Sequence, residues 1–377
     1  MIQRVDPTLV CTIEKFGKGT WNECFHCGNC TAVCPLTEQG SLFPRKPYRA
    51  MQMGLKTSLA HSTEPWLCYY CGDCSKTCPR NANPGETMMI LRRYLTTVYD
   101  WTGISKLIYS SKIMELVAIA ILAIVTAVLY LTYTTFPSGN TDNLIGADGG
   151  ALINTMAPSH IIHIGDWVMA GILAFLLITN LFNMWYKIIL SDKSVKVPFG
   201  SYFTMLFALA INFMTQKRFN KCDGPKSYWF IHLFLMLSYV MLFTMIVFFL
   251  NWFQTDTVYP IWHPQRLLGY IATIGLFVGV IYFINNRFKK MKENSKYSHY
   301  TDWTFLVLLL LTTATGILMH FFRIYGMPTA TYVTYLIHLM VLVPMLVIEV
   351  PFSKWSHLAY RPFAVYFAKV KNAAVNK

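Results

Sequence analysis

The sequence predicts a mainly α-helical protein in two parts, a small cysteine-rich helical domain at the N-terminus followed by a six-helix membrane bundle. Three observations support this fold class. Nine of the ten cysteines precede residue 80, in a region that Pro and Gly interrupt repeatedly. Six long apolar stretches follow from residue 113 onward. The 377 residues have a mean hydropathy of +0.40 and only 13% charged residues, which argues against a purely soluble protein.

The domain boundaries follow from this change in composition. Residues 1–100 are the predicted cysteine-rich domain, 101–112 a linker, 113–360 the membrane domain and 361–377 a cytoplasmic tail. A further apolar stretch, Ser201–Phe213, is too short to cross a bilayer and is predicted to lie at the membrane interface. Each predicted span is near the ~20 residues that a crossing helix needs. The predicted spans are Ile113–Phe136, Ile161–Leu190, Tyr228–Phe253, Pro264–Arg287, Asp302–Arg323 and Tyr332–Val350.

The net charge of +14 has a topological explanation. Basic residues gather after the second, fourth and sixth spans, whereas residues 137–159, 254–263 and 324–331 contain no Lys or Arg. Because basic loops stay in the cytoplasm, the cysteine-rich domain and the C-terminus are predicted to be cytoplasmic, with the spans in the inner membrane. No basic recognition module is visible, so no nucleic-acid partner is expected. The basic residues are Lys193, Lys196, Lys217, Arg218, Lys221, Lys226, Arg287, Lys289, Lys290, Lys292, Lys296, Lys354, Arg361, Lys369, Lys371 and Lys377.

Two cysteine runs share the spacing C-x2-C-x2-C-x3-C-P, one ending at Pro35 and the other at Pro79. This is the spacing of bacterial ferredoxins with two 4Fe–4S clusters, in which the fourth cysteine of each run binds the other cluster. Gly28 and Gly72 are expected to let the chain turn tightly between ligands. The predicted ligand sets are Cys24, Cys27, Cys30 and Cys78 for one cluster, and Cys68, Cys71, Cys74 and Cys34 for the other.

Zinc is the competing interpretation of these cysteines, because it also binds thiolates. Structural zinc sites, however, use pairs of ligands separated by longer loops rather than two complete four-cysteine runs. Cys11 and Cys222 lie outside the runs, and no role is predicted for them. The spacing therefore favours iron–sulfur clusters.

The segments beside the cysteine runs carry a family resemblance. Phe43–Gly54 is predicted to form a short helix that ends at Gly54, and the sequence Asn83-Pro-Gly-Glu86 is predicted to begin another. With the paired runs, these segments make residues 20–98 similar to the C subunit of heterodisulfide reductase. The resemblance implies an electron-carrying domain with two 4Fe–4S clusters.

Six of the ten histidines lie within or at the ends of predicted spans, where ionisable side chains are costly and indicate function. His338 and His357 flank the sixth span, about 28 Å apart if the helix is continuous. This is close to the ~30 Å thickness of the hydrocarbon core, so one histidine is expected near each face. On an ideal helix their rings would point about 100° apart, and we therefore predict a bulge or kink between Leu342 and Ile348.

The segment from His338 to Arg361 resembles the last span of respiratory nitrate reductase gamma subunits and heterodisulfide reductase E subunits. In that family the two matching histidines bind separate b haems, which implies two b haems here, one at His338 and one at His357. Their partners are expected from a neighbouring span at matching depth. His232 is the predicted partner of His357.

The sequence offers more than one candidate for the partner of His338. His163 is predicted from its depth in the second span, with His320 and His160 as alternatives. The gamma-subunit family places both partner histidines on a single helix. Leu173 and Leu242 stand where that arrangement would need a second histidine, so this part of the family pattern is missing.

A quinone site is predicted beside the outer histidines, with menaquinone as the expected substrate. Asp166 follows His163 by about one helical turn and could orient it or take a proton from quinol. His263 and Arg323 are the further candidates for this site. Glu115 and Glu349, near the cytoplasmic face, are expected to reach solvent.

These features together predict a membrane electron-transfer subunit that links quinone in the lipid to a cytoplasmic redox partner. The direction of electron flow depends on potentials that the residues do not fix. Nearly the whole chain resembles the C subunits of quinone-interacting membrane-bound oxidoreductase complexes. That resemblance implies flavin-containing, heterodisulfide-reductase-A-like partner subunits and a link to adenylylsulfate reductase in sulfur metabolism, with substrate catalysis beyond quinone chemistry in the partner subunits.

Two alternatives remain open at the level of sequence. The same electron path could serve a hydrogenase or a heterodisulfide-type reductase. From a different class of protein, the chain could be a membrane anchor or an ion-translocating subunit whose histidines bind no haem.

Overall fold

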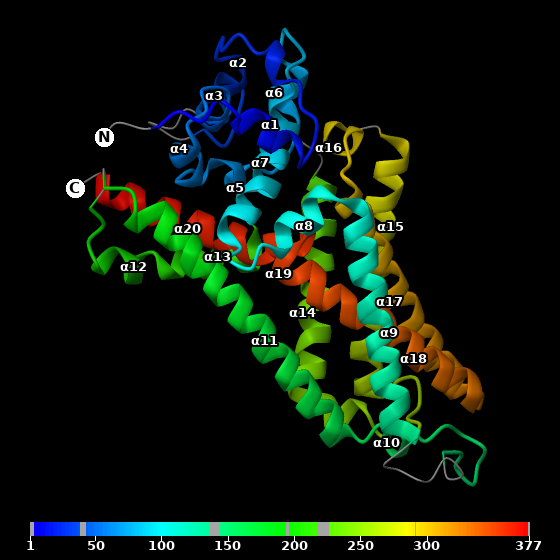
Figure 1. The fold of residues 1–377 in the computed structure, drawn as a ribbon. Coiled ribbons are helices and arrows are strands. Elements are labelled where there is room, and N and C mark those ends of the chain that lie inside the picture. Colours follow the sequence, from blue (N-terminus) through cyan, green and yellow to red (C-terminus); the bar gives the residue numbers. More distant parts are fainter. Residues whose placement is uncertain are drawn as a thin grey trace.

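The computed structural model describes residues 4–37, 43–135, 144–193, 196–216, 226–290 and 292–375. These residues form helices throughout, apart from turns, loops and one isolated antiparallel bridge between Ile145 and Ala151. Figure 1 shows a small helical domain at one end of a bundle of long helices, which confirms the predicted fold class. Some residues used in the predictions lie outside the described ones, namely Phe136, Lys217, Arg218, Lys221, Cys222 and Lys377.

The N-terminal domain is built from short helices around a core that includes Trp21, Met51 and Trp66. The two helices predicted beside the cysteine runs are both present. Asn83 caps the longest helix by accepting a hydrogen bond from the backbone N–H of Glu86 at 3.2 Å. The helices are α1 (Leu9–Glu14), α2 (Asn29–Ala32), α3 (Arg45–Gln52), α4 (Lys56–Ala60), α5 (Glu64–Leu67), α6 (Asp73–Lys76) and α7 (Pro84–Tyr99), and α8 (Ile104–Ser110) leads to the bundle.

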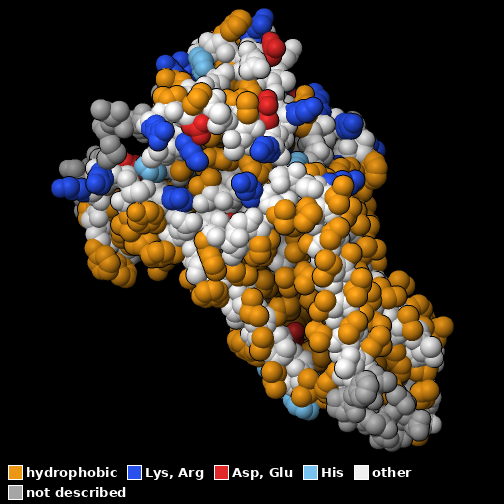
Figure 2. Space-filling model, in the orientation of Figure 1, with side chains coloured by type: hydrophobic (Ala, Val, Ile, Leu, Met, Phe, Trp, Pro, Cys, Tyr) orange, Lys and Arg blue, Asp and Glu red, His pale blue; other side chains and the backbone are white. Residues whose placement is uncertain are grey.

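Six helices among the described residues are long and apolar enough to cross a membrane. Their surface is almost wholly apolar on the face in Figure 2, whereas Lys and Arg gather on the N-terminal domain and at its junction with the bundle. The chain is therefore a multi-pass membrane protein. The spans are α9 (Lys112–Thr135), α11 (Ser159–Trp185) with the π-helix η3 (Tyr186–Leu190), α14 (Lys226–Phe253), α15 (Pro264–Lys289), α17 (Tyr300–Ile324), and α18 (Pro328–Pro344) with the π-helix η5 (Met345–Glu349).

The sixth span departs from a regular helix where the sequence predicts it. The π-helix η5 follows Pro344 and covers most of the predicted window, so the predicted bulge is confirmed. A second break lies beyond it, at Ser353, whose φ of −127° and ψ of −147° are not helical. The assumption of one continuous helix from His338 to His357 is therefore wrong. His357 instead begins a new helix, α20 (His357–Val375).

Helix α20 contains most of the residues predicted as a tail. It crosses beneath the N-terminal domain in Figure 1 and joins that domain to the bundle. Tyr360 is fully buried, with its ring centroid 5.1 Å from that of Trp66 and 5.7 Å from that of Tyr99. One apolar core thus continues from the N-terminal domain into α20 and the C-terminal end of the second span, at Met184, Ile188 and Ile189.

The short apolar stretch forms two helices rather than one, α12 (Gly200–Thr204) and α13 (Leu206–Thr215), which meet at Met205. One face of the pair packs on α20, and Tyr366 donates a hydrogen bond to the carbonyl of Tyr202 at 2.7 Å. The other face exposes Phe203 and Phe207. This exposed apolar face is what an interfacial helix presents to lipid.

Candidate metal centres

The structure brings the eight clustered cysteines together in the two sets that the sequence predicts. We call the sites the first and second cluster pockets. Each pocket takes three cysteines from one run and the fourth from the other, because the helices α2 and α6, which lie within the two runs, pack side by side. The first is lined by Cys24, Cys27, Cys30 and Cys78. The second is lined by Cys34, Cys68, Cys71 and Cys74.

The two runs fold in the same way around their pockets. Gly28 and Gly72 have φ values of +89° and +90°, which only glycine adopts readily, so each turns the chain as predicted. Backbone N–H groups point at cysteine sulfurs in both, with the N–H of His26 at 3.5 Å from Cys24 Sγ and that of Tyr70 at 3.3 Å from Cys68 Sγ. Such donors stabilise the negative charge of ligating thiolates.

Four cysteines line each pocket, which is the number of thiolate ligands that a 4Fe–4S cluster takes. Burial raises the pKa of the Cys34 thiol to about 12 and also raises that of Cys30. Iron must therefore displace protons from these thiols on binding.

The two cluster pockets differ in their surroundings. Cys27 of the first pocket is exposed, and Phe25 beside it is among the more exposed large side chains of the domain. Cys68 and Cys74 of the second pocket are buried. The first pocket thus faces solvent, and the second faces the interior of the molecule.

Two arginines hold the backbone of the second pocket. Arg92 and Arg361 both donate a hydrogen bond to the carbonyl of Cys68, the bond from Arg361 being 3.1 Å long. The guanidinium of Arg361 also lies 4.0 Å from the ring centroid of Tyr69, which lines the pocket. Because Arg361 belongs to α20, this contact ties the second pocket to the membrane bundle.

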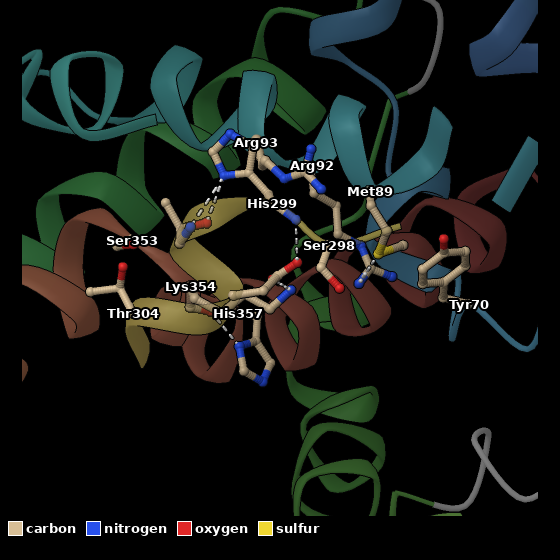
Figure 3. Close-up of polar contacts among 12 residues, drawn as sticks. Tyr70, Met89, Arg92, Arg93, Ser298, His299, Thr304, Ser353, Lys354 and His357 are labelled. Carbon is tan, nitrogen blue, oxygen red and sulfur yellow. Dashed lines mark hydrogen bonds and ion pairs between the residues drawn. The ribbon is translucent and has the colours of Figure 1, made fainter. Parts of the chain in front are cut away.

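His232 and His357 face each other in a cavity of about 760 Å³, which we call the histidine cavity. Their ring centroids are 6.4 Å apart. The Nδ1 of His357 donates to the carbonyl of Lys354 at 2.6 Å, as Figure 3 shows, and the Nδ1 of His232 donates to Oε1 of Gln216 at 2.8 Å. With Nδ1 of His357 held in this way, its Nε2 is the nitrogen that would bind a metal, the usual arrangement for histidine ligands.

The chemistry of the histidine cavity fits a metal centre with two imidazole ligands. Metal–imidazole bonds of about 2 Å on opposite sides of one ion would place the ring centroids about 6 Å apart. Burial and nearby cations hold the pKa of His357 well below its ordinary value, so its imidazole is neutral, the form that binds metal. The remaining walls are mostly apolar, with Leu235, Met236 and Phe305 among them.

A larger cavity, of about 1670 Å³, lies deeper in the bundle between α11, α14, α15, α17 and α18; we call it the large membrane cavity. His338 lines it, and its Nδ1 is 2.9 Å from the hydroxyl of Thr315. His320 lines the same cavity, where its ring bonds to Tyr270 at 2.7 Å and to Arg266. The structure therefore brings His338 and His320 to one space.

Of the other residues predicted for the outer haem and the quinone site, some line this cavity and the rest do not. Asp166 and Arg323 line it. Nε2 of His163 is instead 2.8 Å from the carbonyl of Val247 and accepts a bond from Trp167. His160 is exposed, and the ring of His263 stacks on Tyr259 with centroids 4.1 Å apart. These last three histidines do not line the large membrane cavity in the described part of the chain.

Neighbouring cavities share wall residues, which sequence reasoning missed. Tyr69 lines both the second cluster pocket and the histidine cavity. Tyr239 and Trp355, with ring centroids 4.5 Å apart, line both the histidine cavity and the large membrane cavity. Trp355 stands two residues before His357, and Tyr69 stands between two cluster ligands, so adjacency to a ligand was the signal that could have indicated them.

The fold and the cluster pockets define a membrane protein of the iron–sulfur electron-transfer class. Residues 20–82 match the family model of the 4Fe–4S dicluster domain. The chain therefore carries a domain for two 4Fe–4S clusters, fused to six membrane-spanning helices. No curated protein and no solved structure matches the chain.

Proposed function

We propose that the chain is a membrane subunit that exchanges electrons between the quinone pool and a cytoplasmic redox partner, through two b haems and two 4Fe–4S clusters. The observation that carries this proposal is a succession of four sites, of which three share wall residues, while the two cluster pockets each take one cysteine from the other's run. The large membrane cavity adjoins the histidine cavity at Trp355, and the histidine cavity adjoins the second cluster pocket at Tyr69. The first cluster pocket then reaches the surface at Cys27.

His232 and His357 are the proposed ligands of the inner b haem. Their neutral imidazoles, each oriented by a hydrogen bond at Nδ1, suit iron in either oxidation state without adding charge to an apolar region. A haem bound there would supply one-electron chemistry, which neither the aromatic walls nor the histidines provide on their own.

His338 is the proposed ligand of the outer haem, with its orientation supported by Thr315. His320, which shares the large membrane cavity, is the better placed partner, and His163 is the alternative. Asp166 and Arg323 are the proposed quinone-binding residues of this cavity. A quinone needs groups that exchange protons and donate hydrogen bonds to its oxygens, and a carboxyl group and a guanidinium meet these needs.

The proposed orientation places the N-terminal domain in the cytoplasm. It is supported by the Lys and Arg residues at this end of the molecule, and by the described loop residues 144–158, 254–263 and 325–331, which contain none. The resemblance of the chain to quinone-interacting oxidoreductase subunits supports flavin-containing, heterodisulfide-reductase-A-like subunits as partners and adenylylsulfate reductase as the enzyme they serve.

A reduced-minus-oxidised visible spectrum of the purified chain tests the proposal. We expect b-type bands, with part of the signal lost in H357A and in H232A and the remainder lost in H338A. The variant H160A, at an exposed histidine, is the control and should retain the full spectrum. A protein that shows cluster signals but no b-type bands would instead be a haem-free membrane anchor.

A further inference from the structure

Two carboxyl groups lie fully buried where the bundle meets the N-terminal domain. Glu115 is on α9 and Glu349 ends the π-helix η5, and both are 0% exposed. The expectation that they reach solvent is therefore wrong. The reason is that α8 and the segment from Ser353 onward fold back over this end of the bundle and cover both side chains.

Neither carboxyl group has a cationic partner among the described residues. Glu115 accepts hydrogen bonds from the hydroxyls of Thr304 at 2.9 Å and of Ser353 at 3.5 Å. One oxygen of Glu349 accepts the backbone N–H of Lys354 at 3.1 Å, and its other oxygen, Oε1, has no hydrogen-bond partner in the described part of the chain. Adjacent residues contact the two groups, since the Ser353 hydroxyl donates to Glu115 and the Lys354 N–H donates to Glu349, so the two carboxylates would repel each other when both are ionised.

Most of the nearby cations are paired with other acids. Lys354 and Arg287 both pair with Asp302, Arg287 at 3.6 Å, and Arg93 pairs with Glu86 at 3.1 Å. Lys112, one turn before Glu115 on α9, is in no ion pair among the described residues, but it is exposed and water screens its charge. The first group carries a net charge of +1 and the second none, so the buried surroundings balance one carboxylate but not two. The titratable and charged groups that face the two carboxyls are Arg93, Tyr109, Lys112, Arg287, His299, Tyr300, Asp302 and Lys354.

A single residue links this site to the histidine cavity. The N–H of Lys354 donates to Glu349, and the carbonyl of the same residue accepts the Nδ1 proton of His357 at 2.6 Å (Figure 3). One residue, Lys354, therefore lies between the His357 ring and the Glu349 carboxyl group, so charge that arrives beside His357 acts on that group over a short distance. In the low dielectric of this region, such an influence is much stronger than it would be in water.

We propose that Glu115 and Glu349 form a proton-binding site, which holds one proton when the neighbouring redox centres are oxidised and binds a second when they are reduced. The coupling to reduction rests on the proposed function. When an electron arrives from quinol or an electrode, one proton from the cytoplasmic water forms an O–H bond on the remaining carboxylate, and the site is then full. The added negative charge is thereby neutralised inside the protein.

Redox-triggered infrared difference spectroscopy of the full chain with its clusters tests this site. On electrochemical reduction we expect a new carbonyl band of a protonated carboxyl group, which shifts in D2O. The band should disappear in the double variant E115Q/E349Q, whereas a single glutamine, which resembles a protonated glutamate, leaves one carboxylate that can still bind the proton. It should persist in E23Q, because Glu23 is an exposed acid paired with Arg80. Absence of the band from the unmodified protein, or its persistence in E115Q/E349Q, would overturn the proposal.

Two further measurements keep the outcomes separate. If the glutamine variants fail to assemble their clusters, as judged by EPR, S353A and T304A take their place. Each removes one hydroxyl contact and should shift the band. An unchanged band in both variants would contradict the assignment. Visible spectra of the same samples report on haem independently. Missing b-type bands would defeat the proposed haem path, whereas the infrared band would still decide the proton site through cluster reduction.

Discussion

At the scale of single residues, Arg361 makes the most consequential contacts outside the ligand sets. Its guanidinium lies over the ring of Tyr69, donates to the carbonyl of Cys68 and lines the histidine cavity. It is the closest positive charge that the membrane domain offers to the second cluster pocket. A positive charge beside a cluster favours its reduced, more negative state.

The variant R361Q should therefore lower the midpoint potential of the second cluster and leave that of the first almost unchanged. An EPR-monitored redox titration measures both values. R80Q is the matched control, because Arg80 lines the first cluster pocket and its removal should lower the potential of the first cluster instead. Equal shifts of both clusters in R361Q would show that the arginine acts on the fold rather than on one site.

The ion pair between Arg93 and Glu86 is the second residue-scale feature. Both side chains are buried, at 7% and 9% exposure, and the pair is tied to its surroundings by bonds to the carbonyl of Phe16 and the hydroxyl of Tyr70. We expect R93A to destabilise the N-terminal domain by about 3–5 kcal/mol, because it leaves a buried carboxylate without its partner.

The stability of cluster absorbance in a thermal ramp is the measurement for R93A. R80A is its control, since the pair of Arg80 with Glu23 is about half exposed and should contribute only about 0–1 kcal/mol. A loss in R93A no larger than that in R80A would contradict the expected role of the buried pair.

At the scale of elements, the sixth span sets the position of His357. The extra residue of the π-helix η5 and the break at Ser353 together decide how His357 meets His232. Deleting Val347 would convert η5 to a regular helix and rotate everything beyond it by about 100°. We expect this deletion to abolish the b-type signal of the inner site while the protein still inserts into the membrane.

Visible spectra of membranes that contain the deletion variant test this expectation. V347A keeps the length of the π-helix and should retain the spectrum of the unmodified protein. If the deletion variant kept both b-type signals, the π-helix would have no role in positioning the ligand.

At the scale of the whole molecule, the sequence predicted the features that depend on local patterns. The six spans, the turns at Gly28 and Gly72, and the grouping of the cysteines all follow from hydropathy or spacing within short segments. The helix start at Asn83 belongs to the same class, because its cap and its first turn are adjacent in the chain. Local chemistry is sufficient to define each of these elements.

Features that depend on packing between distant segments were not predictable in this way. Burial of Glu115 depends on α17 and on Ser353, which are far from it in sequence. Most of helix α20 was predicted as a cytoplasmic tail, yet the helix packs on the N-terminal domain, and Tyr360 near its start lies in the core of that domain. The surroundings of His320 and His163 likewise depend on which helices pack against each other. Depth in the membrane alone therefore did not decide which histidine is the partner of His338.

The aromatic seam of Trp66, Tyr99 and Tyr360 has a mechanical consequence. Since α20 starts at a proposed haem ligand and packs into the core of the N-terminal domain, these buried ring contacts hold that domain in place beside the bundle. The distances between successive proposed redox centres then stay constant during electron transfer. The rate of electron transfer would then be limited by how often an external electron carrier docks at the exposed surface near Cys27. A change in the orientation of the N-terminal domain would not limit it.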